Sequence, residues 1–432
     1  RLIIMFCLTC WSVMVQAQNS FSKQWDKRFG GTKNDFLETF IKVSSGGYLA
    51  GGYSNSQLSG DKTQNCHSNS EDYWIVRIDD SGNKVWDKSF GSSSPDVLFR
   101  ALETEDRGFI LAGFSGGGIS GDKTEPSRGA EDFWIVRIDS IGNKLWDRRY
   151  GGSGIEYLLA LDYCEDKGFI MGGFSSSGVS GDKTQANHDP TGFYYDYWII
   201  KVDSLGNKQW DKSFGGEDDD VLRSIIKTKD HGYLLCGATD SDSTGDMTQK
   251  SRGYRDFWIV KVDSTGNKQW DKRYGGDDGD DLFSAKELSD GYILAGSSSS
   301  FMSGDKTNNY GGYWFVRVDA TGNILWDKSC ADLTGAQLKE VYLTGDNGFL
   351  LSGSSGSPIY GDKSEDSQGQ DQLWVVKVDS FGTKEWDKTI FTNRSTKGLS
   401  LPLSEHCYIA ATATTAGILG YKIEPNWDAT LN

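Results

Sequence analysis

The sequence predicts an all-β fold made of seven repeats, each a four-stranded antiparallel sheet, closed into a ring. One observation is the period: tryptophan followed by aspartate and then lysine or arginine recurs about every 60 residues. A second is that each repeat holds four short segments rich in β-branched and aromatic residues, bounded by Gly, Asn, Asp or Ser. A third is the absence of helical periodicity. The repeated tryptophans are Trp25, Trp86, Trp146, Trp210, Trp270, Trp326 and Trp386.

The four segments of one repeat follow the same order each time. The last two are joined by a short loop with glycine at the position that needs positive φ, as in Asp80–Asn83, so they form a hairpin. A single four-stranded sheet cannot bury both of its faces. Neighbouring sheets must therefore stack, and a ring leaves no exposed end. The segments of the first full unit are 36–43, 47–54, 72–79 and 84–90.

Closure of the ring is expected at the N-terminus. The seventh unit lacks the usual hairpin turn and is one strand short, whereas the segment around Trp25 precedes the first full unit as a spare strand. We expect that spare strand to pair beside 417–424, giving seven blades, and the chain thus resembles the seven-bladed β-propellers. An alternative fourth strand, 425–431, is disfavoured because Pro425 removes a ladder donor.

The chain is expected to hold one propeller domain, 18–432, after a signal peptide, 1–17. Arg1, an apolar run and the small residue Ala17 are typical of a secretory signal cleaved after Ala17. Cys10 leaves a lipoprotein signal as an alternative, although Trp11 fits it poorly. The units lie near 32–91, 92–151, 152–215, 216–275, 276–331, 332–391, and 392–432 with 21–31.

Composition narrows the classes of partner. With 45 basic and 61 acidic residues the net charge is -16, which disfavours nucleic acid and anionic membrane surfaces. No segment after the signal is long and apolar enough to insert into a membrane. We expect the propeller to be a monomer. The cysteines do not form a disulfide framework: after the signal they are Cys66, Cys164, Cys236, Cys330 and Cys407.

Residues that recur in every unit are expected to serve the fold. The third-strand tryptophans should pack between blades. The third strand also carries a cation in each unit, and the fourth carries the aspartate after tryptophan, so we expect an ion pair in each blade, such as Lys201 with Asp211.

A loop signature, Ser-Gly-Asp-Lys-Thr or a close variant, lies between the second and third strands. Aspartate in such a loop forms turns by accepting backbone hydrogen bonds. The functional alternative is a set of calcium ligands, although calcium needs six to eight converging oxygens and each loop supplies one aspartate. The candidates are Asp61, Asp122, Asp182, Asp246, Asp305 and Asp362. We expect no other cofactor.

The chain is similar to two enzyme families of propeller fold only in part. Its hairpins, such as Asp263 to Trp270, resemble the sialidase Asp-box and the quinoprotein tryptophan repeat, but the spacing of aspartate differs in both. Only four histidines are present, and no P-loop, nucleophile elbow or dinucleotide motif occurs. The sequence therefore predicts no catalytic residues.

The repeat blocks Gly-Gly-Tyr-Leu-Ala-Gly-Gly-Tyr-Ser, Ser-Gly-Asp-Lys-Thr and Gly-Asn-Lys-Val-Trp-Asp-Lys resemble those of secreted propeller-like proteins of Bacteroidetes. Such proteins are commonly exported by type IX secretion. The resemblance implies a secreted or cell-surface location.

We therefore expect a binding or adhesion module without catalytic activity, whose partner is a glycan or a protein surface. The alternative is a carbohydrate-active enzyme, a glycosidase or lyase. Because the ligand should contact residues that differ between units, we place the site on the longest loop and the acidic inter-blade segments. The candidates are His188, Asp189, Phe193, Tyr194, Tyr195, Asp218, Asp219, Asp278 and Asp280.

Overall fold

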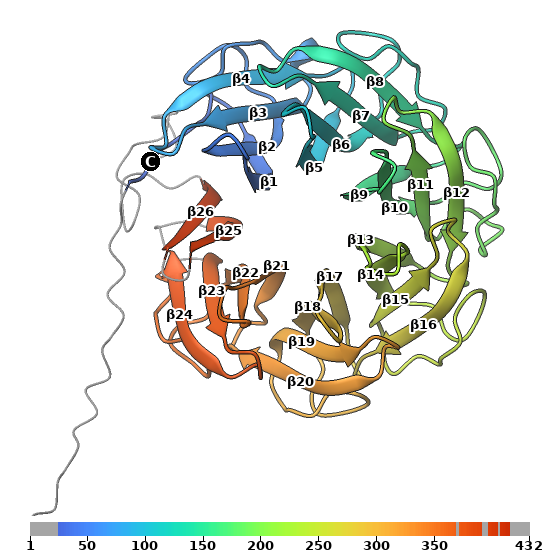
Figure 1. The fold of residues 1–432 in the computed structure, drawn as a ribbon, viewed down its shortest axis with the longest axis vertical. Helices are drawn as coiled ribbons and strands as arrows, with labels where there is room; N and C mark the ends of the chain where they lie inside the picture. Colours follow the sequence, from blue (N-terminus) through green and yellow to red (C-terminus); the bar gives the residue numbers. More distant parts are fainter. Residues whose placement is uncertain (1–24, 369–370, 391–395, 405–406, 415–432) are drawn as a thin grey trace, which may run out of the picture.

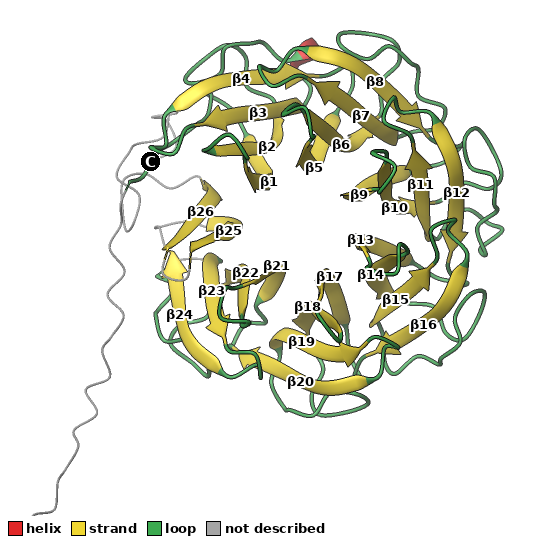
Figure 2. Cartoon of the chain, viewed as in Figure 1, coloured by secondary structure: helices red, strands yellow, loops and turns green. Residues whose placement is uncertain are grey.

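The protein is a ring of antiparallel sheets arranged around a central axis (Figure 1). The structure is a computed structural model, and it describes residues 25–368, 371–390, 396–404 and 407–414. Strands and loops make up this part, with one short 3-10 helix, η1 (His67–Asn69) (Figure 2). The described part thus has the all-β character predicted from the sequence.

Six sheets have four strands each and are numbered here as blades. Blade 1 contains β1 (Asp35–Lys42), β2 (Tyr48–Ser54), β3 (Asp72–Ile78) and β4 (Lys84–Phe90). Blade 2 contains β5 (Asp96–Glu103), β6 (Phe109–Ser115), β7 (Asp132–Ile138) and β8 (Lys144–Tyr150). Blade 3 contains β9 (Glu156–Tyr163), β10 (Phe169–Ser175), β11 (Asp196–Val202) and β12 (Lys208–Phe214).

The other three blades follow the same pattern. Blade 4 contains β13 (Asp220–Lys227), β14 (Tyr233–Thr239), β15 (Asp256–Val262) and β16 (Lys268–Tyr274). Blade 5 contains β17 (Asp280–Glu287), β18 (Gly291–Ser298), β19 (Gly312–Asp319) and β20 (Ile324–Ala331). Blade 6 contains β21 (Gln337–Leu343), β22 (Phe349–Ser355), β23 (Gln372–Val378) and β24 (Lys384–Ile390). The first strand of each blade lies innermost and the fourth lies outermost (Figure 1).

The prediction of seven four-stranded blades was wrong, because the structure has six. The described residues of the seventh unit form a two-stranded sheet, β25 (Thr396–Ser404) with β26 (Cys407–Thr414), between blades 6 and 1. The seventh unit carries Pro402 inside its first strand and lacks the repeat's hairpin sequence. The expected closing strand is absent from the described residues Trp25–Asn34, and residues 21–24 and 417–424 lie outside the described part.

The third-strand tryptophans form the core between blades, as predicted. Each of five is buried and contacts an aromatic ring of the preceding blade; Tyr73 and Trp134, for example, have ring centroids 4.8 Å apart. Trp25 makes a related contact outside any strand, since its ring lies against Gly82 as Trp86 lies against Gly142. The tryptophans with such a partner are Trp134, Trp198, Trp258, Trp314 and Trp374.

The predicted ion pair between Lys201 and Asp211 was wrong. Lys201 lies opposite Trp210 in the sheet, and Ile200 lies opposite Asp211. The side chains of Lys201 and Asp211 therefore project from opposite faces of the sheet. Lys201 instead pairs with Asp166 at 2.5 Å. Asp211 accepts hydrogen bonds from the Thr184 amide and hydroxyl, the Trp198 indole and the Lys208 ammonium group, at 2.8 to 3.1 Å. The aspartate after tryptophan thus joins the fourth strand to the loop between the second and third strands.

The lysine of the loop signature is buried beneath its own loop. In blade 3, Lys183 lies 6.0 Å from the Trp198 ring and donates to Ser213 at 2.7 Å. Blade 4 has Met247 in place of the lysine and Arg273 in place of the serine. Arg273 is 1% exposed in its side chain and pairs with Asp256. The buried cation has therefore moved from the loop to the fourth strand.

This exchange gives a prediction for blade 4. Met247→Lys should destabilise the protein by about 2 kcal/mol, because Arg273 already occupies the Ser241 carbonyl, the counterpart of the Gly117 carbonyl to which Lys123 donates in blade 2. Adding Arg273→Ser recreates the arrangement of blade 3 and should recover at least half of the loss. Thermal melting measures both, with Met302→Lys as a matched control because Met302 is 60% exposed. A double variant no more stable than Met247→Lys would contradict the exchange.

Pairs of carboxyl groups lie at four junctions between blades. Each pair joins the first residue of a third strand to the first residue of the next blade, and all eight residues have 0% exposure. A glycine between them leaves the necessary room: a Cβ at Gly215, for example, would collide with Asp196. The pairs are Asp72 with Asp96, Asp132 with Glu156, Asp196 with Asp220, and Asp256 with Asp280.

The junction of blades 5 and 6 shows that these residues change together. Gly312 replaces the third-strand acid, Ala336 replaces the first-strand acid, and Ala331 replaces the glycine. In place of the pair, the single carboxylate of Asp332 accepts a hydrogen bond from the Ser355 hydroxyl at 2.6 Å. The glycine is therefore retained where two carboxyl groups must fit side by side.

Candidate functional site

The long loop of blade 3, 176–195, is organised by Asp189. Its carboxylate accepts hydrogen bonds from Thr191, Phe193 and Tyr194 at 2.6 to 3.0 Å. Burial acts to raise the pKa of Asp189, but these hydrogen bonds outweigh it and hold the pKa at about 2. Asp189 is therefore committed to shaping the loop. A groove of about 440 Å³ runs along this loop, lined in part by Ser153, Asn187 and Thr191.

His188 lies between blades 3 and 4. Its Nδ1 lies 3.1 Å from the buried Asp196, and its Nε2 lies 3.6 Å from Asp246 of the next blade. The hydrogen bond with Asp196 raises the pKa of His188, while burial opposes the shift. His188 thus holds two blades together.

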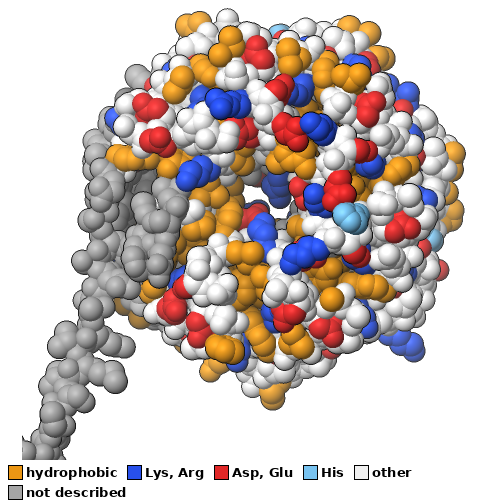
Figure 3. Space-filling view, in the orientation of Figure 1, with side chains coloured by type: hydrophobic (Ala, Val, Ile, Leu, Met, Phe, Trp, Pro, Cys, Tyr) orange, Lys and Arg blue, Asp and Glu red, His pale blue; other side chains and the backbone are white. Residues whose placement is uncertain are grey.

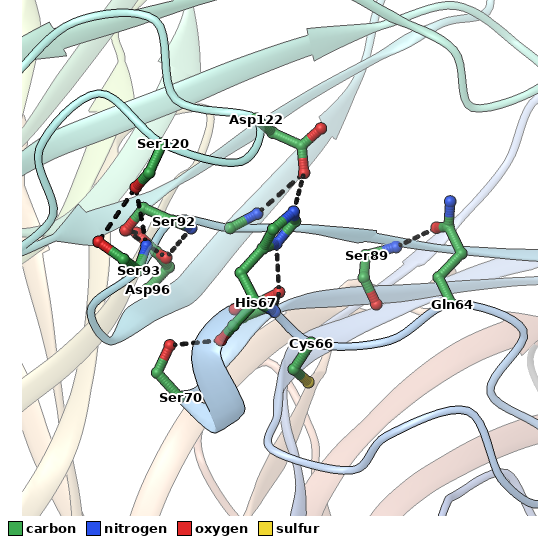
Figure 4. A network of polar contacts seen from close by, with 12 residues as sticks. Gln64, Cys66, His67, Ser70, Ser89, Ser92, Ser93, Asp96, Ser120 and Asp122 are labelled. Carbon is green, nitrogen blue, oxygen red and sulfur yellow. Dashed lines mark hydrogen bonds and ion pairs between the residues drawn. The ribbon is translucent and has the colours of Figure 1, made fainter.

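His67 occupies the corresponding place between blades 1 and 2 (Figure 4). Its Nδ1 contacts Asp72 at 2.9 Å, and its Nε2 lies 3.9 Å from Asp122. Arg128 takes this position between blades 2 and 3 and pairs with Asp182. Arg252 takes it between blades 4 and 5 and pairs with Asp305. A basic side chain between blades is therefore a feature of the repeat, with histidine at two of the four positions.

The candidate calcium ligands belong to the same junctions. Asp122 accepts the Gly91 amide at 3.2 Å, and its own amide donates to the Gly91 carbonyl at 2.8 Å. The other five make the corresponding contact with the end of the preceding fourth strand, or with Gly30 in the first case. No group of three or more potential metal ligands occurs among the described residues. These aspartates are Asp61, Asp122, Asp182, Asp246, Asp305 and Asp362.

The predicted aromatic residues of the loop differ in exposure. Phe193 is 81% exposed and Tyr194 is 42% exposed. Tyr195 is half-buried, with its ring 4.7 Å from Phe174. Its amide donates to Asp219 at 3.1 Å, which ties the loop to the segment before blade 4.

The predicted acidic residues occupy three environments. Asp218 is half-buried beside Ser241, which accepts from its amide at 2.8 Å. Burial raises the pKa of Asp219, and Arg255 opposes this shift. Asp278 is exposed, whereas Asp280 is wholly buried in its carboxyl pair. Asp280 therefore lies inside the fold and away from any surface ligand.

Tyr195 is the end of an aromatic array that sequence reasoning missed. The rings follow one another across blades 2 and 3 with centroids 4.1 to 6.0 Å apart, and the Phe114 and Tyr157 rings are parallel within 6°. Most members are half-buried, so ring surface remains open to solvent. The array comprises Phe99, Phe114, Tyr157, Phe174 and Tyr195.

Several of the same repeat positions carry charged residues in blades 4 and 5, although Phe283 of blade 5 is aromatic at the position of Phe99. Arg255 takes the position of Tyr195, Arg223 takes that of Phe99, and Asp281 takes that of Tyr157. Arg255 pairs with Asp240 at 3.1 Å and lies 3.6 Å from Asp281. Burial raises the pKa of Asp240 to about 6, although Arg255 opposes this shift. The aromatic residues thus lie in blades 2 and 3, whereas charged residues occupy corresponding positions in blades 4 and 5.

The signal for this asymmetry was present in the repeats. The sixth residue of the second strand is aromatic in the first three blades and small in the next three, yet the six sheets have the same topology. Packing of the repeat therefore does not require an aromatic residue there. These residues are Tyr53, Phe114, Phe174, Ala238, Ser297 and Ser354.

Comparisons with known proteins find similar solved structures but no family for the chain. No protein family and no curated protein matches the chain. A Bacteroides caccae protein of unknown function is similar at 14% identity, over 73% of this chain and 89% of that one, with a TM-score of 0.40. The Neurospora crassa Pan2 WD40 domain is similar at 10% identity, over 84% and 81%, with a TM-score of 0.45.

A streptogramin B lyase structure is similar at 9% identity, over 89% of this chain and 97% of that one, with a TM-score of 0.43. These neighbours include a protein of unknown function, a WD40 domain and an enzyme, so they do not separate binding from catalysis. No helix in the described part of the chain is long and apolar enough to cross a membrane.

Proposed function

We propose that the chain is a secreted or cell-surface binding module that takes an oligosaccharide on the aromatic array of blades 2 and 3. The observation that carries this proposal is the array itself, because five rings follow one another across blades 2 and 3, whereas blades 4 to 6 have small residues at the second-strand position of Phe114 and Phe174. Flat aromatic faces pack against the C–H faces of sugar rings.

The surroundings of the array support a glycan ligand. Phe193 and Tyr194, which precede Tyr195 in the chain, add exposed aromatic side chains to the same loop. The groove along the same loop is lined by small and polar residues, among them Ser153 and Thr191, which offer hydroxyl and backbone groups for sugar hydroxyls. A shallow aromatic surface of this kind favours binding over the carbohydrate-active enzyme considered from the sequence.

A glycan array probed with the purified protein tests the proposal. Tyr194→Ala with Tyr195→Ala should weaken any glycan bound at least tenfold, since each lost ring contact is worth about 1 kcal/mol. Tyr157→Ala should weaken the same glycan, which separates the array from the loop. Phe381→Ala is the matched control, because Phe381 is 73% exposed in a hairpin turn of blade 6.

Two outcomes would overturn the proposal. Full affinity in both aromatic variants would remove this face as the binding site. Binding of protein ligands alone, with no glycan retained on the array, would assign the module to a protein partner instead.

A further inference from the structure

The centre of the ring holds a second feature that the aromatic array does not use. A cavity of about 370 Å³ is lined by the inner strands of blades 2 to 6. In Figure 3 the ring is open at its centre, and Lys and Arg side chains lie in and around the opening. The cations that line the cavity are Arg100, Arg223, Lys227 and Lys286, and the carboxylates are Asp162, Glu287 and Glu340.

The carboxylates of the cavity are already engaged. Glu340 accepts from Lys286 at 2.8 Å and from the Ser284 hydroxyl at 2.6 Å. Asp162 accepts the Lys227 amide at 2.9 Å, and Glu287 accepts the Lys229 amide at 3.1 Å. These contacts neutralise Lys286. Arg100 interacts electrostatically with Glu340 and Glu38 without forming an ion pair with either, and Arg223 has Asp281 as its carboxylate partner.

Both arginines have donors to spare. Arg100 donates to the Phe99 carbonyl at 3.1 Å and makes no ion pair within 4.0 Å among the described residues. Arg223 reaches Asp281 through one long contact of 3.3 Å, while its Nε is buried and has no hydrogen-bond partner. A guanidinium group carries five N–H donors, so each arginine can take a bidentate oxyanion.

The repeat does not require these arginines. At the position of Arg100 the other blades have Thr39, Ala160, Ser224, Ser284 and Glu340. Blade 4 has the one arginine at the position of Arg223, where the other five blades have Glu38, Phe99, Leu159, Phe283 and Lys339. The guanidinium carbon of Arg223 lies 4.5 Å from the centre of the Phe283 ring, and this contact limits the conformational freedom of the arginine side chain. Both arginines therefore stand at positions where the other blades have different side chains.

We propose that the central cavity binds a small molecule bearing a carboxylate or phosphate group, held by Arg100 and Arg223. The cavity lies within the size range of small-molecule sites, and a protein of net charge -16 has little reason to keep uncommitted cations at its centre unless an anion occupies them. The site is separate from the glycan surface, and either can fail without the other.

Calorimetric titration with three probes tests the site: glucuronate, inorganic phosphate and neutral glucose. At least one anionic probe should bind more tightly than glucose, and binding should weaken as salt is raised. Arg100→Gln with Arg223→Gln should reduce that affinity at least tenfold. Lys167→Gln with Lys250→Gln, which removes the same charge from exposed loops outside the cavity, should leave it unchanged.

The probe that binds identifies the chemical class of the ligand. Glucuronate alone indicates an acidic sugar or other carboxylate, and phosphate alone indicates a phosphorylated ligand; either supports the site. Arg100→Gln alone keeps the test valid if the double variant does not fold. Failure of both anions to bind, or equal binding by the double variant, would overturn the proposal, while Tyr194→Ala with Tyr195→Ala should leave anion binding intact.

Discussion

Asp211→Ala is expected to destabilise the protein by about 3 kcal/mol or more, the cost of leaving one half-buried ammonium group and three neutral donors without their acceptor. The 5% exposed residue accepts four hydrogen bonds, from Thr184, Trp198 and Lys208. Burial acts to raise the pKa of Asp211, yet these hydrogen bonds lower it, which shows how strongly the ionised form is held. Thermal melting of the purified variant at pH 7 measures the loss.

Asp166→Ala is the matched control for this prediction. Asp166 is the carboxylate that Lys201 contacts, and it is 42% exposed. An exposed pair of this kind is worth about 1 kcal/mol or less. A result in which Asp166→Ala costs more than Asp211→Ala would mean that the third-strand cation, rather than the aspartate after tryptophan, holds each blade together.

The failed prediction of the ion pair shows what the sequence leaves undetermined. The period and the apolar alternation identify Trp198 as core and place Lys201 and Asp211 on neighbouring strands. They do not fix the register, and a shift of one residue moves a side chain to the other face of the sheet. In the structure each hairpin also shifts register between Lys201 and Val202, or at the equivalent step, which no composition rule predicts.

The functional face was predicted only in part. Tyr195 was found because its loop is long, but Phe114 and Phe174 were hidden inside strands, where aromatic residues are expected for packing. Only a comparison with Ala238 at the same position shows that packing does not require them. His188 was assigned to a ligand because it lies on the longest loop, whereas the matching contacts of His67 and His188 show that His188 belongs to the junction between blades.

The carboxyl pairs predict an unusual pH dependence of stability. Burial, together with the partner carboxyl, raises the pKa of Asp96 and of Asp280 to about 6, and the pKa values of Glu156 and Asp220 are also raised. One proton shared by each pair would relieve the repulsion, and one oxygen of both Asp256 and Asp280 lacks a hydrogen-bond partner.

The sign follows from comparing folded and unfolded states. A group whose pKa is raised by folding stabilises the protein fully below its unfolded pKa, near 3.8 here, and this stabilisation is lost as pH rises through the folded value. His188, with a raised pKa, acts in the same direction. Carboxylates with lowered pKa values, such as Asp211, lose their contribution as pH falls below about 4. Stability should therefore be greatest near pH 5.

Melting temperatures between pH 4 and 7.5 test this expectation, and the range stops below the titration of buried lysines such as Lys183, whose pKa burial lowers to about 8. From pH 5 to 7 the melting temperature should fall by about 3 °C or more, since a pKa raised from 3.8 to about 6 loses about 1.3 kcal/mol of stabilisation over this interval at each of Asp96 and Asp280.

Asp280→Asn should flatten this fall, because an amide keeps the hydrogen bonds from Gly276 and Ser300 and can donate to Asp256 without titrating. Burial lowers the pKa of the nearby Lys306 to about 8, so this ammonium group stays mostly charged between pH 5 and 7 and the change in slope over that interval reports the carboxyl groups. Asp263→Asn, in a hairpin turn where the pKa is about 2, should shift the whole curve without changing its slope. An equal slope in Asp280→Asn and the parent protein would show that the buried pairs do not titrate between pH 5 and 7.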